Sequence, residues 1–137
     1  MKMYRLTLGH IMAILFFSLT SITTFAQSRV QSVSLAGNAY VTQRADKVHI
    51  SDNGVENWNS PQTTVSAYFH VDKPQTITLS LQGTGHATMR MACNGKEQDI
   101  KFDSDEPTVA GNLKIKISKP GYVRVDLKGM KRDGGNF

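Results

Sequence analysis

Residues 75–82 read QTITLSLQ, and apolar and polar side chains alternate along the whole stretch. Ile77, Leu79 and Leu81 fall on one side of an extended chain, and hydroxyl and amide side chains fall on the other. A period of two is typical of a β-strand with one buried face and one solvated face. The stretch therefore predicts an antiparallel sheet rather than a helix.

The same period continues outward from this stretch in both directions, through TTVSAYFHV at residues 63–71, NLKIKIS at 112–118 and YVRVDLK at 122–128. Turn-forming dipeptides, among them Asn53-Gly54 and Asn94-Gly95, separate the runs and favour hairpins. We expect strands over residues 30–35, 39–41, 48–51, 63–71, 75–82, 87–93, 96–102, 113–118 and 121–128. Short strands at this spacing predict an all-β fold, either a two-sheet antiparallel sandwich or a barrel.

The first residues have the layout of a secretory signal. Lys2 and Arg5 precede an apolar run at residues 11–25, and small side chains at Thr24 and Ala26 suit a signal peptidase. We expect a signal peptide over residues 1–26 and a single domain over 27–137, exported to the periplasm, the cell surface or the extracellular space. An uncleaved anchor is the alternative, although the run is short for a membrane span. No cysteine follows the run, which excludes a lipoprotein, and no later segment predicts membrane insertion.

The net charge and the single cysteine limit the classes of partner and of chemistry that this domain can have. The net charge of +5 includes the two basic residues of the leader, so the mature domain is only mildly basic, and export argues against a nucleic-acid partner. Cys93 is the only cysteine, so no intramolecular disulfide can form. It shares strand parity with Met89 and Met91, which predicts a buried, inert thiol.

The loop NGVENWNSPQ, residues 53–62, holds the only tryptophan. In one interpretation Trp58 stacks on the apolar face of a sugar while the amides of Asn57 and Asn59 bind its hydroxyls. In the other, Trp58 folds over one end of the core and points its N–H at a carbonyl oxygen. The sequence alone leaves both interpretations open.

Other polar clusters give weaker signals. FDSDEPT contains Asp103, Asp105 and Glu106, which could hold calcium, but three carboxylates fall short of the six to eight oxygens that calcium takes, so a solvated acidic turn is expected. The histidines are too widely spaced for a metal site, and we expect them at the surface or the rim: His49, His70 and His86. We expect no metal, no cofactor and no catalytic residue, although two carboxylates meeting in space would allow a hydrolase.

The C-terminal part is basic, and Lys114, Lys116, Arg124 and Lys128 fall on solvated faces. Such a patch would suit an acidic polysaccharide or an anionic membrane surface. Lysines also serve solubility and protect the edges of sheets, which is the commoner role.

The order of these motifs resembles the Domain of Unknown Function 5077 family over nearly all of the mature chain. The pieces that carry the resemblance are Asn57-Trp58, Tyr68-Phe69 and the stretch PGYVRVDLKG at residues 120–129. The tryptophan before a strand of the form YFxV is similar, more distantly, to galactose-binding-like carbohydrate-binding modules. That similarity implies a sandwich of jelly-roll type, with a ligand either in the loops at one end or on a concave face.

Two departures from the family pattern stand out. Gln75 follows Lys73-Pro74 where the pattern predicts glycine, which suggests an altered hairpin. Family members also continue past the glycine pair near the C-terminus, which leaves open whether a closing strand is missing and whether the domain acts alone.

The sequence therefore predicts a non-catalytic, exported, carbohydrate-binding or glycan-associated module. Trp58, Asn57 and Asn59 are its expected ligand residues, with Tyr40 and Tyr68 as further rings. A structural domain that docks on a partner domain or protein, with no small-molecule site, is the alternative.

Overall fold

The computed structural model describes residues 29–135 and 137, and every regular element in that part of the chain is a β-strand. The predicted all-β class is confirmed. The chain divides into two compact units, Met1–Gln31 and Ser32–Phe137, and all of the strands belong to the second. Of the first unit only residues 29–31 are described; they are exposed and form no strand. The predicted signal peptide, residues 1–26, lies outside the described residues.

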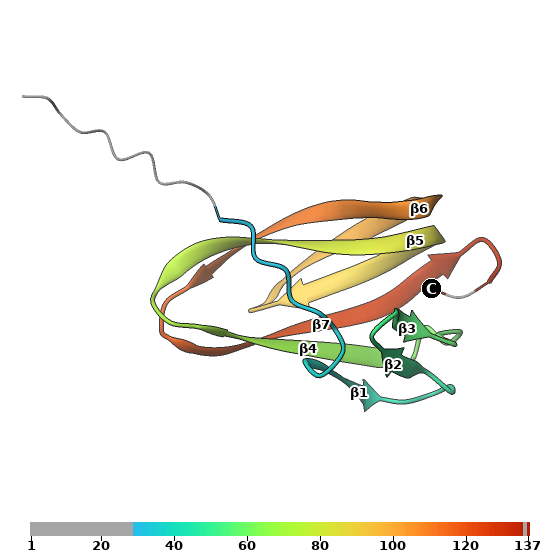
Figure 1. Ribbon diagram of the computed structural model, residues 1–137, viewed down its shortest axis with the longest axis horizontal. Coiled ribbons are helices and arrows are strands. Elements are labelled where there is room, and N and C mark those ends of the chain that lie inside the picture. Colours follow the sequence, from blue (N-terminus) through green and yellow to red (C-terminus); the bar gives the residue numbers. More distant parts are fainter. Residues whose placement is uncertain (1–28, 136) are drawn as a thin grey trace, which may run out of the picture. The chain divides into compact units, whose positions relative to one another are not determined.

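Seven strands make up the second unit (Figure 1): β1 (Ala39–Gln43), β2 (His49–Ser51), β3 (Gly54–Glu56), β4 (Thr64–Val71), β5 (Gln75–Cys93), β6 (Lys96–Ile117) and β7 (Gly121–Arg132). Five of them form an antiparallel sheet in the order β1-β4-β7-β5-β6, and β2 pairs with β3 in a separate hairpin. The strand expected over residues 30–35 is wrong, because residues 29–34 are irregular and a turn follows them. That turn is closed by the N–H groups of Asn38 and Ala39, which both donate to the carbonyl of Leu35.

The long hairpin of β5 and β6 replaces four strands that the sequence analysis expected as separate elements. Its tip is the predicted Asn94-Gly95 turn, where φ is 48° at Asn94 and 74° at Gly95, as a tight hairpin turn requires. The pairing runs from Cys93 opposite Lys96 to Gln75 opposite Ile117, with shifts of register between Leu79 and Leu81 and between Gly83 and Gly85. The turn-like residues between the expected strands are therefore irregularities within one bent ribbon.

The bend brings the two halves of β6 together at one side of the domain. Gln98 and Asn112 exchange two hydrogen bonds: the Gln98 amide donates to the Asn112 side-chain oxygen at 2.8 Å, and the Asn112 N–H donates to the Gln98 oxygen at 2.9 Å. Lys96 Nζ donates to the carbonyl of Lys114 at 3.0 Å. Side chains of one half thus join the edge of the other half.

Gly111 lies where β6 turns back, and its substitution tests this bend. Its φ is +87°, and a Cβ placed there would lie 2.8 Å from Ile100 Cδ1. We expect Gly111→Ala to lower the free energy of unfolding by about 1–3 kcal/mol, because both the backbone and the buried Ile100 must adjust. Urea unfolding would measure the change. Gly134→Ala, also at positive φ but with open space around it, is the control for backbone strain alone. Equal losses in the two variants would mean that Ile100 does not crowd this site.

A single hydrophobic core gathers the apolar sides of the strands. It contains residues of both halves of the long hairpin together with β4 and β7, and its members include Val65, Met91, Phe102, Ile115, Val125 and Leu127. Cys93 is 3% exposed, as its parity predicted. Burial, and then the charge of Asp126, raises the pKa of the Cys93 thiol. The thiol therefore stays protonated and unreactive at neutral pH.

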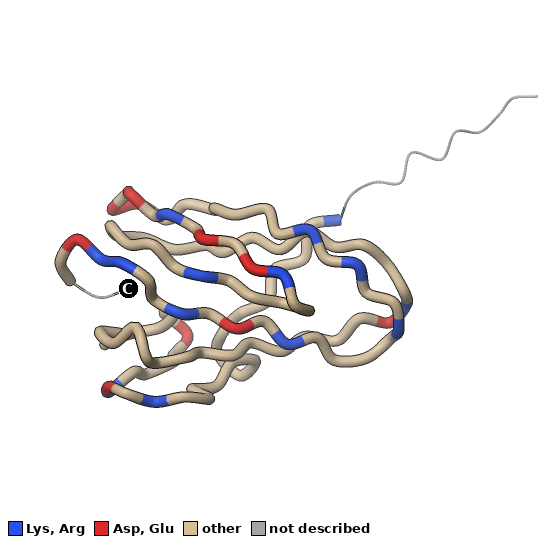
Figure 2. The backbone as a smooth tube through the Cα atoms, turned by 180° about the vertical axis from the view of Figure 1, so that it is seen from behind, with Lys and Arg blue, Asp and Glu red and all other residues tan. Residues whose placement is uncertain are grey.

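The opposite, outward side of the five-stranded sheet is polar. Register places Tyr40 opposite Ser66, Ser66 opposite Asp126, and Tyr68 opposite Arg124, so these side chains share one face. Figure 2 shows that the Lys, Arg, Asp and Glu positions of this sheet lie on β7, β5 and β6. We call this surface, carried by β1, β4 and β7, the outer face.

Candidate functional site

Trp58 belongs to the core. The side chain is 2% exposed, and its indole N–H donates to the carbonyl of Ser60 at 3.2 Å. The ring of Phe137 meets it edge-on, with centroids 6.2 Å apart, and the Phe137 N–H donates to the Trp58 carbonyl at 2.9 Å. The interpretation that Trp58 offers a face to a sugar is wrong for this structure, because the ring has no open face. The alternative, in which the ring closes one end of the core and its N–H meets a carbonyl, describes what is found.

Asp46 fixes the loop that carries Trp58. Its carboxylate accepts hydrogen bonds from the N–H groups of Asn59 at 2.5 Å and Ser60 at 2.7 Å, and from the hydroxyl of Thr63 at 2.5 Å. Desolvation acts to raise the pKa of Asp46, but the hydrogen bonds from Thr63, Asn59 and Ser60 outweigh it and lower this pKa below its ordinary value. The loop is therefore organised around an ionised carboxylate.

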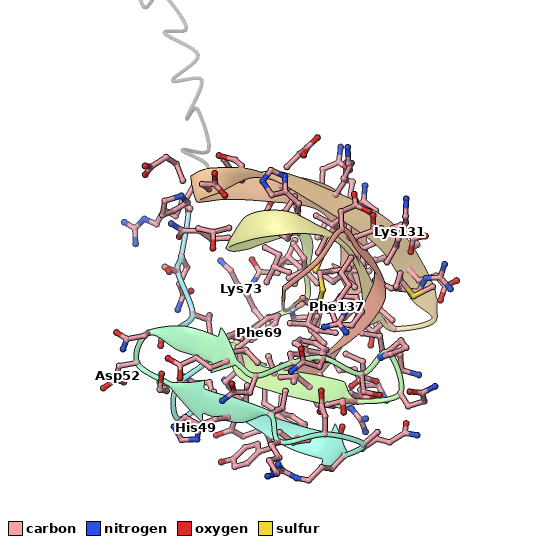
Figure 3. The ribbon with its side chains drawn as sticks, turned by 90° about the vertical axis from the view of Figure 1, so that its right-hand side faces the viewer. His49, Asp52, Phe69, Lys73, Lys131 and Phe137 are labelled. Atoms are coloured by element: carbon pink, nitrogen blue, oxygen red, sulfur yellow. The ribbon has the colours of Figure 1, made fainter. Side chains whose placement is uncertain are left out.

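The side-chain amide of Asn59 braces this loop. Asn59 donates to the carbonyl of Asn57 at 3.0 Å, and its side-chain oxygen accepts from Arg132 Nη1 at 2.7 Å. Asn57 is exposed, with a φ of 57°. Arg132 also donates to the carbonyl of Gly135 and lies 5.7 Å from the centre of the Phe137 ring. Figure 3 shows Phe137 turned toward the body of the domain, so these residues close the end of the core together.

Tyr40 and Tyr68, the two further rings that the sequence analysis named, come together on the outer face. Their centroids are 6.1 Å apart in an edge-to-face arrangement, and Tyr40 is 61% exposed. A second aromatic pair, His70 and Tyr122, lies on the same face with centroids 5.2 Å apart. The outer face thus presents rings to solvent, which the Trp58 loop does not.

A hollow of about 200 Å³ lies on the outer face and is lined by Thr42, Gln43, Thr64, Arg124, Asp126 and Lys128. The buried hydroxyl of Ser66 donates to Asp126 at 2.5 Å and lies 2.7 Å from the hydroxyl of Thr42. Arg124 Nε donates to the same Asp126 oxygen at 2.7 Å. The contact with Asp126 is the leading cause that raises the pKa of Arg124. The hollow therefore combines hydroxyl, amide, carboxylate and cationic groups, several of them held by one another.

Beyond the hollow, one cation of this sheet is paired across two strands. Arg90 on β5 binds Asp99 on β6 through two hydrogen bonds, at 2.6 and 3.0 Å, and lies 3.6 Å from Glu97. This contact lowers the pKa of Asp99 and raises that of Arg90. Lys128, at the rim of the hollow, forms no ion pair within the described part of the chain.

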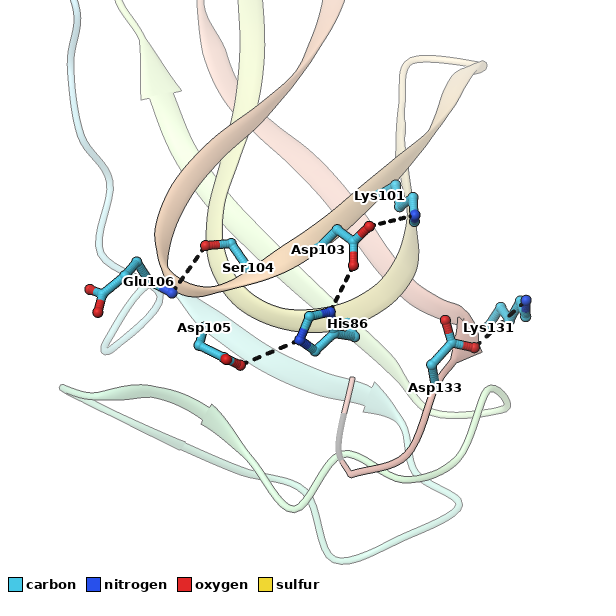
Figure 4. Close-up of polar contacts among 8 residues, drawn as sticks. All are labelled: His86, Lys101, Asp103, Ser104, Asp105, Glu106, Lys131 and Asp133. Atoms are coloured by element: carbon cyan, nitrogen blue, oxygen red, sulfur yellow. Dashed lines mark hydrogen bonds and ion pairs between the residues drawn. The ribbon is translucent and has the colours of Figure 1, made fainter.

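The acidic segment lies around His86 (Figure 4). Nδ1 of His86 lies 2.7 Å from Asp103 and Nε2 lies 3.4 Å from Asp105, while Lys101 Nζ donates to Asp103 at 2.8 Å. Lys101, and then His86, lower the pKa of Asp103 to about 2. The hydrogen bond with Asp103 is the leading cause that raises the pKa of His86. Asp103 and Asp105 are thus engaged with cationic partners, and the described residues contain no group of side chains suited to a metal ion.

A wider hollow of about 480 Å³ lies beside this cluster, between Val55, His86 and Phe137. The exposed side chains of Glu56 and Asp133 are among its lining residues. His86 is already committed to Asp103 and Asp105, and Asp133 lies 3.6 Å from Lys131, which leaves Glu56 as the main charged group there to orient a ligand. The hollow on the outer face is the better candidate.

The sequence analysis named Tyr40, Tyr68, Arg124 and Lys128, but it missed the other residues that line the hollow: Thr42, Gln43, Thr64 and Asp126. Alternation placed Ser66 on a solvated face, which is wrong because Ser66 is buried beneath Thr42 and Asp126. Alternation also could not show that β1, β4 and β7 are neighbours. That neighbourhood follows from pairing between residues about 60 positions apart, as in Ser66 and Asp126. No local signal carries this information.

An all-β domain with an aromatic and polar outer face is the class of protein that these observations define. The family model for the domain of unknown function DUF5077 matches residues 33–137, and the chain belongs to this family. A comparison with curated proteins finds no match. In the residues that the structure describes, no helix is long and apolar enough to cross a membrane.

Proposed function

We propose that this protein is a non-catalytic, exported carbohydrate-binding module and that its glycan lies on the outer face, against Tyr40 and Tyr68. The observation that carries the proposal is the pair of rings beside a hollow lined by hydroxyl, amide and charged groups. Rings supply apolar area to the C–H face of a sugar, and the polar groups direct its hydroxyls.

The proposed fold is a sandwich of jelly-roll type. Its support is the bent hairpin of β5 and β6, whose two halves contribute to one core with β4 and β7. In this architecture the outer face of the five-stranded sheet is the natural binding surface, because the end of the sandwich near Trp58 is filled by Phe137. The proposed location, in the periplasm, at the cell surface or outside the cell, depends on the signal-like residues 1–26.

A binding role fits the hollow better than a hydrolytic one. Asp126 is the only carboxylate among its lining residues, and it is occupied by Ser66 and Arg124. Glycoside hydrolysis commonly takes two carboxyl groups on opposite sides of the scissile bond. Asp126 is therefore assigned to holding Arg124 and accepting a sugar hydroxyl.

Substitution of Tyr40 tests the proposal directly. We expect the purified protein to bind at least one neutral oligosaccharide in a calorimetric panel, and Tyr40→Ala to weaken that binding about tenfold or more, since a stacked ring contributes area and orientation together. Val109→Ala removes another exposed apolar side chain, which is 69% exposed and carried by β6. We expect the affinity of this control to be unchanged.

The competing function is a docking domain that packs on a partner protein. It is favoured by the exposure of two large rings on one sheet face, 61% for Tyr40 and 80% for Tyr122. If no glycan binds and Tyr40→Ala instead abolishes association with a partner protein, the docking function replaces the carbohydrate-binding one. Loss of affinity in Tyr40→Ala and Val109→Ala alike would remove the outer face from the proposal.

A further inference from the structure

The parts of β5 and β6 that lie away from the Asn94-Gly95 turn carry a second surface, which the proposed glycan site does not use. Lys114 and Lys116 are exposed on β6, and register places them opposite the exposed hydroxyls of Thr78 and Thr76 on β5. Lys96, the first residue of β6, contacts the other half of that strand through its hydrogen bond to the Lys114 carbonyl. Two further lysines lie in the turns at the end of this ribbon. We call Lys73, Lys96, Lys114, Lys116 and Lys119 together the lysine face.

The lysine face has no counter-charge of its own. The sequence contains no Asp or Glu at residues 73–96 or 107–125, so β5 and the half of β6 that bears Lys114 and Lys116 contain no carboxylate; the acidic residues of the hairpin lie between Glu97 and Glu106. None of the five lysines forms an ion pair with another described residue. Two acidic residues are adjacent to the lysine face in the sequence: Asp72, which lies 2.9 Å from His70, and Glu97, which lies 3.6 Å from Arg90.

Other cations of the same sheet set a contrast. Arg90, Lys101 and Arg124 each contact a carboxylate, although Lys128 contacts none among the described residues. On the lysine face the corresponding cross-strand neighbours are threonines. Lys114 and Lys116 lie about 7 Å apart at the usual rise of a strand, so their charges repel one another without compensation.

Edge protection does not account for this arrangement. The edge of β6 near Lys114 is already covered by side chains of its own first half, through Lys96 at the Lys114 carbonyl and Gln98 at Asn112. A lysine that protects an edge is needed where the backbone groups are open to another chain. Lys114 and Lys116 instead lie on a part of β6 whose edge is already covered by side chains of the same strand.

We propose that the lysine face binds an acidic polysaccharide, a polymer with a carboxylate or sulfate on successive sugar rings. Lys114 and Lys116 supply cations in a row along the strand, and the hydroxyls of Thr76 and Thr78 lie beside them for the neutral groups of the sugars. The polymer would follow the direction of the ribbon and contact several rings in turn.

The same residues argue against other polyanions. Residues 73–82 and 107–120 contain no aromatic ring, whereas sites for single-stranded nucleic acids commonly stack bases on such rings. Polar side chains, not large apolar ones, lie between the lysines, whereas a surface that inserts into a membrane presents apolar side chains. The polysaccharide is therefore the occupant that fits this chemistry.

Polygalacturonate is a suitable probe, because its fully methyl-esterified form has the same backbone without the charge. We expect the purified protein to bind polygalacturonate at low ionic strength, with an affinity that falls as sodium chloride is added. Lys114→Gln with Lys116→Gln is expected to weaken binding about tenfold or more. The esterified polymer should not bind at this face. Equal binding of both polymers would overturn the proposal.

Lys47→Gln with Lys131→Gln is the matched control, because it removes the same number of lysines away from the lysine face. We expect the control to bind within about twofold of the parent protein; an equal loss in both double variants would show that net charge alone is responsible and would overturn the assignment. Tighter binding to phosphatidylglycerol vesicles than to polygalacturonate would overturn it in favour of a lipid headgroup. Thermal unfolding of each variant checks that the fold is intact.

Tyr40→Ala separates this proposal from the carbohydrate site of the outer face. We expect it to bind polygalacturonate as the parent protein does, because Tyr40 lies on β1 and the lysine face lies on β5, β6 and the flanking turns. Loss of binding in Tyr40→Ala would place the polymer on the outer face and would rule out the lysine face as its binding site. A failure of neutral glycans to bind would leave the lysine face unaffected.

Discussion

Trp58→Ala is expected to lower the free energy of unfolding by about 3–5 kcal/mol, the range for truncation of a large buried aromatic side chain. The ring is 2% exposed, contacts Phe137 edge-on and donates a hydrogen bond to Ser60. Its removal opens a cavity at the end of the core and takes away one of the two donors that the described residues offer to the Ser60 carbonyl, the other being the Thr63 N–H. Chemical denaturation followed by circular dichroism would measure the loss, since the tryptophan itself is then absent.

Trp58→Phe is the matched variant, because it keeps an aromatic ring but removes the indole N–H. We expect it to cost less than Trp58→Ala, with about 1–2 kcal/mol attributable to the hydrogen bond and the smaller ring. Blue-shifted fluorescence of the parent protein would report the same burial. A loss below about 1 kcal/mol in Trp58→Ala would mean that the ring is exposed in solution, and the loop would again be a candidate ligand site.

Asp46→Ala is expected to lower the free energy of unfolding by about 2–4 kcal/mol at neutral pH, because three hydrogen bonds to a charged group are lost and two of their donors remain partly buried. The donors are the N–H groups of Asn59 and Ser60 and the hydroxyl of Thr63. The loop would lose its anchor, and Trp58 would be held less firmly. Asp52→Ala, an exposed carboxylate in the turn between β2 and β3, is the control and should change stability little.

The difference in unfolding free energy between the parent protein and Asp46→Ala depends on pH, because the pKa of Asp46 is lowered in the folded protein. Near and below pH 4 the unfolded chain binds more protons at this residue than the folded one does, so stability falls as the pH falls. The contribution of Asp46 is fully present above its unfolded pKa, near 3.8, and is lost as the pH drops through the lower folded pKa. The gap between the parent protein and Asp46→Ala should therefore narrow below pH 3.8. A gap that is constant down to pH 2 would contradict the assigned role of the ionised carboxylate.

Comparison of substitutions at Trp58 and Asp46 with substitutions at Tyr40 and Tyr68 separates effects on stability from effects on binding. Trp58 and Asp46 act at the closed end of the core, whereas Tyr40 and Tyr68 act on the outer face. A variant of the first group should unfold more easily and, while still folded, keep its affinity for a glycan on the outer face. A variant of the second group should lose affinity and keep its stability.

Much of the domain could be predicted from local patterns. The alternation in residues 63–71, 112–118 and 122–128 predicted which side chains face the core, and Val65, Ile115 and Leu127 are buried accordingly. Asn94-Gly95 predicted the hairpin tip, and the parity of Cys93 predicted its burial. These features depend on the two-residue period and on positive φ, which are properties of a few neighbouring residues.

Three features depended on the tertiary structure: the sheet order β1-β4-β7-β5-β6, the fusion of four expected strands into one bent hairpin, and the burial of Trp58. Sheet order follows from pairing between distant strands, which no local period encodes. Whether GTGH at residues 83–86 ends a strand or only bends it depends on the partner strand that continues alongside. Trp58 is buried because Phe137, 79 positions later in the sequence, covers its edge. A residue's own neighbours set the direction of its side chain, but only the folded chain determines what lies in that direction.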